Sequence, residues 1–281
     1  MLGSMLYETK NLIPIHCLHY AWMGWPTPGT VLPAPGIHLT GDAADPDLTR
    51  AWEGDGIACI AESWTPQLAQ MTFRVNPGVS PIAFTQRVKG RLQHALRQCG
   101  TPSSFSRKVG MRALGENIGA TVQSYVREQL AHVDLADPRY AQLLADAAIE
   151  DAAIDLSQPA ETQSGRYWYN LHLVLVTAAR YRVGPELNIQ AWAATVRDAA
   201  RASGCAVRAL AVMPDHVHLA LRGSPELSPL EIGVLFQNAL AKTAGGREWQ
   251  EKFYVGTFGE YSLRGLRKKA PGGLAPPEPK F

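Results

Sequence analysis

The stretch Met213-Pro-Asp-His-Val-His-Leu-Ala-Leu221 places two imidazoles, those of His216 and His218, on either side of an apolar residue. Side chains alternate between the two faces of a β-strand, so both imidazoles share one face and Val217 lies on the other. Two neutral imidazoles held side by side on a rigid strand can bind one divalent cation. The stretch therefore predicts a strand that supplies two metal ligands.

A second chemical segment lies about ninety residues earlier, in Asn117-Ile-Gly-Ala-Thr-Val-Gln-Ser-Tyr-Val-Arg-Glu-Gln-Leu130. Tyr125 and Gln129 are four residues apart, so on a helix they share a face. We interpret Tyr125 as a nucleophile and Gln129 as a third metal ligand. The two segments act together only if the fold brings this helix to the histidine strand, which we expect.

Composition limits the class of protein. The chain has 281 residues, of which 46% are hydrophobic, enough for one large domain or two modest ones. No apolar run approaches the length of a membrane span, and the N-terminus lacks the pattern of a signal peptide. The four cysteines, at positions 17, 59, 99 and 205, form no CxxC pair. We therefore expect a reduced, cytoplasmic protein without disulfides, without a zinc-cysteine site and without membrane contact.

Charge is distributed unevenly along the chain. Residues 63–115 contain eight lysines or arginines and no acidic residue, whereas residues 136–165 carry six acidic side chains and one basic side chain. A basic run is typical of a solvated surface as well as of contact with a polyanion. It favours the polyanion when nucleic-acid chemistry lies nearby.

The chain is predicted to contain two copies of one module. In the second copy we expect strands at 167–177 and 206–212, a helix near 188–203, the histidine strand, a helix from Ser228-Pro229 and a segment ending at Gly259. In the first copy we expect strands at 13–22, 57–61 and 68–75, a helix from Ser80-Pro81 and a segment ending at Gly115. Serine before proline, with Glu231 three residues after Ser228, is a typical helix start. Each copy predicts a small antiparallel sheet with helices on one face.

Boundaries follow from this repeat. We predict an acidic helix from Leu135 to Leu156 and a flexible linker at 157–165, and the insertion at 24–56 predicts an ordered loop or an extra hairpin. The predicted regions are a first module at 1–134, the helix and linker at 135–165, a second module at 166–269 and a disordered tail at 270–281.

The two copies have lost complementary parts. When Gly115 is aligned with Gly259, Tyr125 falls opposite Lys269 and Gln129 falls in the tail, so the second copy lacks the tyrosine. The histidine strand falls opposite approximately residues 70–72, Gln-Met-Thr, so the first copy lacks the metal pair. Each copy keeps what the other has lost, which indicates one composite site.

Together, the Pro-Asp-His-Val-His-Leu strand, the Ser-Pro helix, the segment Trp249–Gly259 and the Tyr-Val-Arg-Glu-Gln helix resemble the single-tyrosine HUH transposases of bacterial insertion sequences. The resemblance covers residues 13–130 and 167–265. It implies an α+β fold of two tandem ferredoxin-like modules with antiparallel sheets, forming an intramolecular pseudo-dimer. It also implies an enzyme that cuts and rejoins single-stranded DNA, in which the helix of one module delivers its tyrosine to the histidine pair of the other.

The resemblance assigns roles residue by residue. His216 and His218 match the metal pair, Tyr125 matches the nucleophile that forms a 5′-phosphotyrosine, and Gln129 matches the residue that completes the metal shell. Two imidazoles and an amide oxygen suit Mg²⁺ or Mn²⁺. Members of the family have two sites, whereas this chain keeps one. Cut-and-paste transposition is therefore in question, and a nickase or recombinase, or two associating chains, are alternatives.

Basic residues near these segments are the expected DNA contacts, with hairpin ends of single-stranded DNA as the partner and a nucleoid-associated location. Those expected to contact phosphate or to line a groove are Arg87, Lys89, Arg91, Arg107, Lys108 and Arg127.

Some of these residues also fit other interpretations. Histidine-triad hydrolases also alternate histidine with apolar residues, but their third histidine position is Ala220 here. Tyr254 and Tyr261 are rival nucleophiles, of which Tyr254 is expected in the core. The remaining histidines, including His172, are interpreted as core or surface residues.

Two other functions are alternatives to a DNA-cutting and rejoining enzyme. The protein could be a non-catalytic, hairpin-binding or regulatory protein derived from a transposase, or a metal-dependent nuclease without a covalent intermediate. The intact set of tyrosine, glutamine and two histidines disfavours the first, and a denaturation-resistant DNA adduct would exclude the second.

Overall fold

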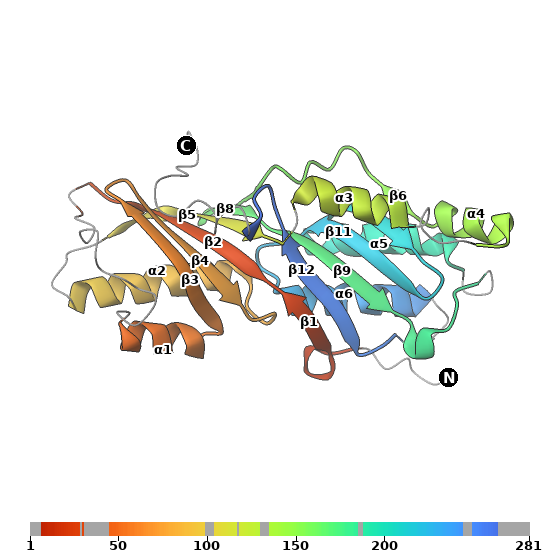
Figure 1. The fold of residues 1–281 in the computed structure, drawn as a ribbon, viewed down its shortest axis with the longest axis horizontal. Coiled ribbons are helices and arrows are strands. Elements are labelled where there is room, and N and C mark those ends of the chain that lie inside the picture. The colour runs from red at the N-terminus through yellow and green to blue at the C-terminus, as the bar shows by residue number, and fades with distance from the viewer. Residues whose placement is uncertain are drawn as a thin grey trace.

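The protein is a mixed α+β structure with two six-stranded sheets, shown by a computed structural model (Figure 1). The structure describes residues 7–28, 30, 45–98, 104–116, 118–129, 135–184, 188–243 and 249–263. The sheets lie side by side, with α1, α2 and α6 on one side and α3 on the other (Figure 1). No described helix has the length and apolarity of a membrane span.

The elements follow each other in an order that repeats. The first half contains η1 (Thr9–Asn11), β1 (Ile13–Cys17), β2 (His19–Pro26), α1 (Pro46–Gly54), β3 (Ile57–Thr65), β4 (Leu68–Val75), α2 (Pro81–Gln98), β5 (Phe105–Leu114) and α3 (Gly119–Glu128). The second half contains α4 (Pro138–Asp146), β6 (Ile149–Glu150), β7 (Ala160–Glu161), β8 (Gly165–Trp168), β9 (Asn170–Val176), η3 (Ala178–Arg180), α5 (Gln190–Ser203), β10 (Ala206–Val212), β11 (His216–Arg222), α6 (Pro229–Thr243) and β12 (Lys252–Phe258).

The two sheets share one connectivity and one register. Their orders are β3-β4-β2-β5-β8-β7 and β1-β12-β9-β11-β10-β6, so the four antiparallel strands of each copy are arranged alike. Ala21 lies between Arg112 and Thr72 in the first sheet. His172 lies between Gly256 and Ala220 in the second. These pairings align the histidine strand with residues 68–70, two residues earlier than the approximate alignment to 70–72. The first copy therefore carries Leu68 and Gln70 at the two histidine positions.

Each opening strand is divided between the two sheets. The expected single strand at 13–22 is instead β1, which pairs in parallel with β12, followed by β2 in the other sheet. The strand at 167–177 is likewise divided into β8, which pairs in parallel with β5, and β9. At this crossing the rings of Tyr20 and Tyr169 lie 6.0 Å apart, edge to face. The exchange joins the two copies through backbone pairing and a shared core.

Local signals fix the helix starts. Ser228 and Glu231 form a capping box, in which Ser228 N donates to the Glu231 carboxylate (2.8 Å) and Glu231 N donates to Ser228 Oγ (3.2 Å). Ser80 Oγ accepts from Ala83 N at the start of α2 (3.3 Å). The Ser-Pro pattern therefore locates both helices correctly.

Three expected segments differ from the structure. The acidic helix ends at Asp146 rather than Leu156, because Ile149 is buried and pairs with β10. The segment 157–165 contains β7, which pairs with β8 rather than forming a structureless linker. Within the insertion at 24–56, the described residues contain α1, capped by Asp45, in place of a hairpin. Helix α1 buries Leu48 and Trp52 and corresponds in chain order to α5. The predicted tail at 270–281 lies outside the described residues.

Candidate functional site

Helix α3 of the first copy packs on the sheet of the second copy (Figure 1). Val126, on the buried side of α3, packs with Ala209, Ala211 and Ala220, whose small side chains let the helix approach the strands closely. The end of β12 guides the helix across, because Gly119 N donates to Gly259 O (2.7 Å). A Cβ on Gly259 would collide with the carbonyl oxygen of Ala113. Gly259, which ends the second expected segment, therefore permits this crossing.

The crossing brings Tyr125 to the histidine strand. The Tyr125 ring lies 5.7 Å from the His218 ring and 6.0 Å from the His172 ring, edge to face in both cases. Tyr125 is 49% exposed. The tyrosine of one copy and the histidines of the other thus form one surface.

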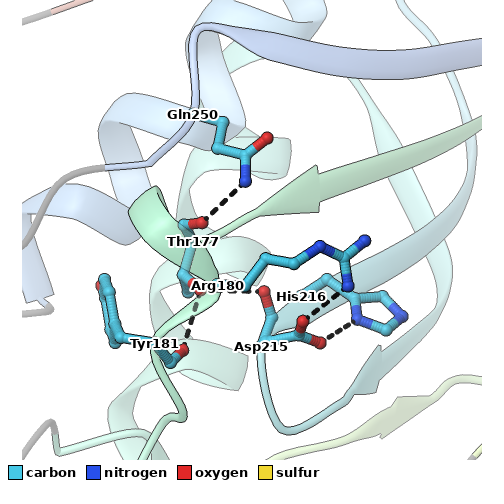
Figure 2. A network of polar contacts seen from close by, with 6 residues as sticks. All are labelled: Thr177, Arg180, Tyr181, Asp215, His216 and Gln250. Carbon is cyan, nitrogen blue, oxygen red and sulfur yellow. Dashed lines mark hydrogen bonds and ion pairs between the residues drawn. The ribbon is translucent and has the colours of Figure 1, made fainter.

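The two histidines of β11 lie on the same face, as alternation predicts. Their ring centroids are 4.9 Å apart. His216 Nδ1 donates to Asp215 Oδ1 (2.6 Å), and Arg180 donates to the other oxygen of that carboxylate (2.8 Å; Figure 2). A carboxylate behind an imidazole fixes the ring and directs Nε2 outward, an arrangement typical of metal-binding histidines.

The turn that carries Asp215 is held by a polar network (Figure 2). The backbone N–H and the hydroxyl of Thr177 both donate to the Asp215 carbonyl oxygen at 2.9 Å, and Gln250 Nε2 donates to the Thr177 carbonyl oxygen (3.2 Å). Arg180 adopts a left-handed backbone conformation (φ 53°), which is costly for a residue with a side chain. The network positions the carboxylate behind His216.

The second ligand candidate, His218, is 4% exposed and has a neighbour that sequence reasoning missed. His218 Nδ1 lies 3.0 Å from His172 Nε2, whereas His218 Nε2 has no hydrogen-bond partner among the described residues. A buried ring nitrogen without a partner is costly, and a cation would satisfy it. Strand alternation was the sequence signal available for His172. His172 and Val174 lie on one face of β9, and Val174 pairs directly with His218.

The electrostatics of the site keep two imidazoles neutral. Burial, reinforced by repulsion from His172 and His216, lowers the pKa of His218 to about 3. Burial lowers the pKa of His172 to about 4. Partial burial pushes the pKa of Asp215 upward, but the hydrogen bond and charge of His216 and the charge of Arg180 outweigh it, so the pKa lies below its ordinary value. Neutral imidazoles beside an ionised carboxylate suit a cation.

Gln129, the expected third ligand, makes its side-chain hydrogen bond within its own helix. It caps the C-terminal end of α3, and its Nε2 donates to the Tyr125 carbonyl oxygen (3.1 Å). Across the part of the chain that the structure describes, no group of three or more His, Cys, Asp or Glu residues could hold a metal ion. A metal shell here would consist of two imidazoles completed by oxygen ligands.

The expected DNA contacts on α2 lie away from Tyr125. Arg91 pairs with Asp55 (3.1 Å), Arg87 donates to the Asp55 carbonyl oxygen (2.9 Å), and Lys89 donates to the Ser106 carbonyl oxygen (2.7 Å). Helix α2 covers the side of the sheets opposite to α3 (Figure 1). The structure therefore does not bring these residues to the tyrosine.

The other basic candidates lie elsewhere on the molecule. Arg107 and Lys108, on β5, line an open depression of about 740 Å³. Arg127 lies on α3 two residues after the tyrosine, donates to Ser124 Oγ (3.1 Å) and lies 3.8 Å from the Glu150 carboxylate. Arg127 is thus the predicted contact nearest to Tyr125 along the chain.

The rival tyrosines occupy different surroundings. Tyr261 lies beside Arg112, whose guanidinium is 5.7 Å from the Tyr261 ring and 3.8 Å from the Trp168 ring. Tyr254 is half-buried, with its ring 5.7 Å from His172, and burial raises its pKa. Tyr254 therefore borders the histidine group rather than filling the core. Lys269, which aligns with Tyr125, lies outside the described residues.

Comparisons with known proteins match the second half of the chain. Residues 166–268 match the family model for IS200-like transposases. One solved structure that matches is a protein from Deinococcus radiodurans R1 described as a transposase, with 25% sequence identity, a TM-score of 0.29, and coverage of 35% of this chain and 85% of that chain. At that TM-score the structural likeness supports no conclusion, and no curated protein matches the chain. The matched residues 166–268 are thus similar to IS200-like transposases, and they carry the histidine strand.

Proposed function

We propose that this protein cuts and rejoins single-stranded DNA at one composite active site, with Tyr125 as the nucleophile. The observation that carries the proposal is the position of Tyr125, which comes from the first copy and packs 5.7 Å from His218 of the second copy. Neither copy contains both parts, so the pairing depends on the crossing of α3. The family match of residues 166–268 supports the same chemistry.

His216 and His218 would hold Mg²⁺ or Mn²⁺ through their Nε2 atoms. Support comes from the buried, unpartnered Nε2 of His218 and from the carboxylate behind His216. When bound, such a cation neutralises phosphate charge and orients the phosphorus for attack. Gln129 remains a candidate third ligand through its Oε1, while its Nε2 donates to the Tyr125 carbonyl oxygen.

In the proposed step the Tyr125 hydroxyl oxygen attacks the phosphorus of a phosphodiester. The bond from tyrosine oxygen to phosphorus forms, the bond from phosphorus to the 3′ oxygen breaks, and the phenolic proton ends on the released 3′-hydroxyl. The product is a 5′-phosphotyrosine, and attack by a 3′-hydroxyl reverses the step without an external energy source. The half-exposed position of Tyr125 leaves room for the strand.

We further propose that the chain is a fused pseudo-dimer of two ferredoxin-like modules. The repeated strand order, the equal pairing registers and the reciprocal exchange of β1 and β8 support this proposal. Two contacts repeat with the same offset, since Gly119 N donates to Gly259 O and Leu263 N donates to Gly115 O. One retained site favours nicking and joining over full cut-and-paste transposition.

The proposed partner is single-stranded DNA, with hairpin ends as the preferred form, in the bacterial cytoplasm. Arg127, on the tyrosine helix, is the foremost phosphate contact, and Arg107 with Lys108 would hold DNA at the open depression. The proposal for Arg87, Lys89 and Arg91 requires DNA that also reaches the α2 side.

A covalent-adduct assay tests the proposed function. Labelled hairpin and single-stranded DNA would be mixed with the full chain and Mn²⁺ and run on a denaturing gel. We expect an adduct that disappears in Tyr125→Phe and His216→Ala and remains in the matched control Tyr261→Phe. An adduct that survives Tyr125→Phe would refute the assigned nucleophile.

The alternative of a binding-only protein follows from the loss of one site. The first copy carries Leu68 and Gln70 at the two histidine positions, and neither residue supplies an imidazole. DNA binding without any adduct across a broad pool of hairpins would favour that alternative. Cleavage without an adduct would favour a metal-dependent nuclease.

A further inference from the structure

We propose that His172 is a positioning residue that accepts a hydrogen bond from His218 Nδ1–H and thereby keeps the Nε2 lone pair of His218 directed at the cation. The inference deepens the proposed function, because the cation belongs to that site. It assigns a role to a histidine on β9, a strand that contributes no ligand of its own to the proposed metal shell.

The geometry of the two rings supports a direct hydrogen bond. His172 Nε2 lies 3.0 Å from His218 Nδ1, and the ring planes differ by only 15°. Both side chains project from the same face of neighbouring strands, since His172 pairs with Ala220 and His218 pairs with Val174. The Tyr125 ring packs edge-on against both imidazoles, which restricts their movement further.

The direction of this hydrogen bond decides the state of the ligand atom. One proton lies between the two nitrogens, so one ring donates and the other accepts. If His172 donated, the proton of neutral His218 would sit on Nε2, a buried atom with no acceptor among the described residues. If His218 donates, Nε2 presents a lone pair that a cation can satisfy. The second arrangement leaves no donor unsatisfied at that atom.

Each of the two proposed ligand imidazoles therefore has a hydrogen-bond partner at its Nδ1, but the two partners differ in chemistry. Behind His216 stands the Asp215 carboxylate, and behind His218 stands the His172 imidazole. The His172 imidazole fixes the tautomer of His218 as a carboxylate would. Because it is neutral, it adds no second negative charge to the site. In the first copy the position of His172 is occupied by Ala21, so the acceptor is missing together with both ligands.

Nitrogen NMR on the full chain, metal-free and labelled with ¹⁵N-histidine, tests the direction of the hydrogen bond. We expect the His218 Nδ1 resonance to show an attached proton and the Nε2 resonance to show none, with the assignment made by loss of both signals in His218→Gln. A proton on His218 Nε2 would overturn the inference. This measurement uses the unaltered protein, so it does not depend on any variant of His172 folding.

Metal titration tests the consequence. Mn²⁺ affinity, followed by electron paramagnetic resonance, would be compared in the unaltered chain, His172→Leu, His172→Gln and the control His94→Leu on the exposed side of α2. We expect His172→Leu to weaken binding by about 10- to 100-fold. His172→Gln, whose amide oxygen can accept, should recover most of that loss, and His94→Leu should match the unaltered chain. Equal affinity in His172→Leu and the unaltered chain would overturn the inference.

The outcomes separate this inference from the proposed function. Suppose that His218 carries its proton on Nδ1 and that His172→Leu binds Mn²⁺ more weakly, but that no DNA adduct forms. This result would reject the proposed function and support the role of His172. An adduct that requires Tyr125, together with unchanged Mn²⁺ affinity in His172→Leu, would support the proposed function and reject the role of His172. Thermal melting of each variant establishes that the comparison is made on folded protein.

Discussion

Acidification should destabilise this protein through the two buried imidazoles that face each other. The folded state holds the pKa of His218 at about 3 and that of His172 at about 4, whereas an unfolded histidine titrates near 6.5. Below pH 6.5 the unfolded state therefore binds more protons than the folded state, so stability falls as pH falls. The loss begins near pH 6.5 and continues down to the folded pKa values.

The magnitude follows from the two shifts. At pH 5 each imidazole is protonated in the unfolded chain and neutral in the folded chain, which costs about 2 kcal/mol per group relative to pH 7.5. The two groups together contribute about 4 kcal/mol, a large share of a typical unfolding free energy of about 5–15 kcal/mol. His218 is buried and His172 is partly buried between neighbouring strands, so solvent screens the cost least at His218.

The assay is urea unfolding in EDTA at pH 7.5, 6.5, 5.5 and 5.0, so that bound metal contributes nothing. The double variant His172→Leu/His218→Leu serves as the reference, because it removes both groups and leaves all other titrating residues. We expect the unaltered chain to lose about 4 kcal/mol more than the reference between pH 7.5 and pH 5. Equal losses in the two proteins would refute the burial of neutral imidazoles.

Three further substitutions test single contacts. Asp215→Asn should weaken Mn²⁺ binding by about 10- to 100-fold, because the amide replaces the carboxylate behind the metal-site imidazole, and a titration that shows no change would contradict that role. Gly165→Ala should lower the unfolding free energy by about 1–3 kcal/mol, since its Cβ would collide with the Val109 carbonyl oxygen where β8 joins β5. Gly256→Ala should cost about 1–3 kcal/mol in the same denaturation assay, because its Cβ would collide with the Tyr254 hydroxyl; an unchanged midpoint would place that hydroxyl elsewhere.

Local chemistry made several elements predictable. The Ser-Pro starts of α2 and α6 depend on hydrogen bonds within one helical turn, so the sequence alone locates them. The common face of His216 and His218 follows from the alternation of a strand, whatever that strand pairs with. The face shared by Tyr125 and Gln129 follows from helix geometry in the same way.

Long-range pairing decided what the sequence alone left open. His172 joins His218 across 46 residues because β9 pairs with β11 in one register, and no local pattern specifies that register. The division of the opening strands between two sheets likewise depends on an edge supplied by the other copy.

By itself, the sequence indicated candidate side chains for the chemistry and determined which faces of their own elements they occupy. Backbone geometry dictates those faces within a few residues. Only the tertiary structure decided that α3 crosses to the other sheet, that Tyr125 packs against two histidines, and that Gln129 turns back to its own helix. The physical reason is that such contacts depend on small residues, such as Ala209 and Gly259, at close approaches between distant segments.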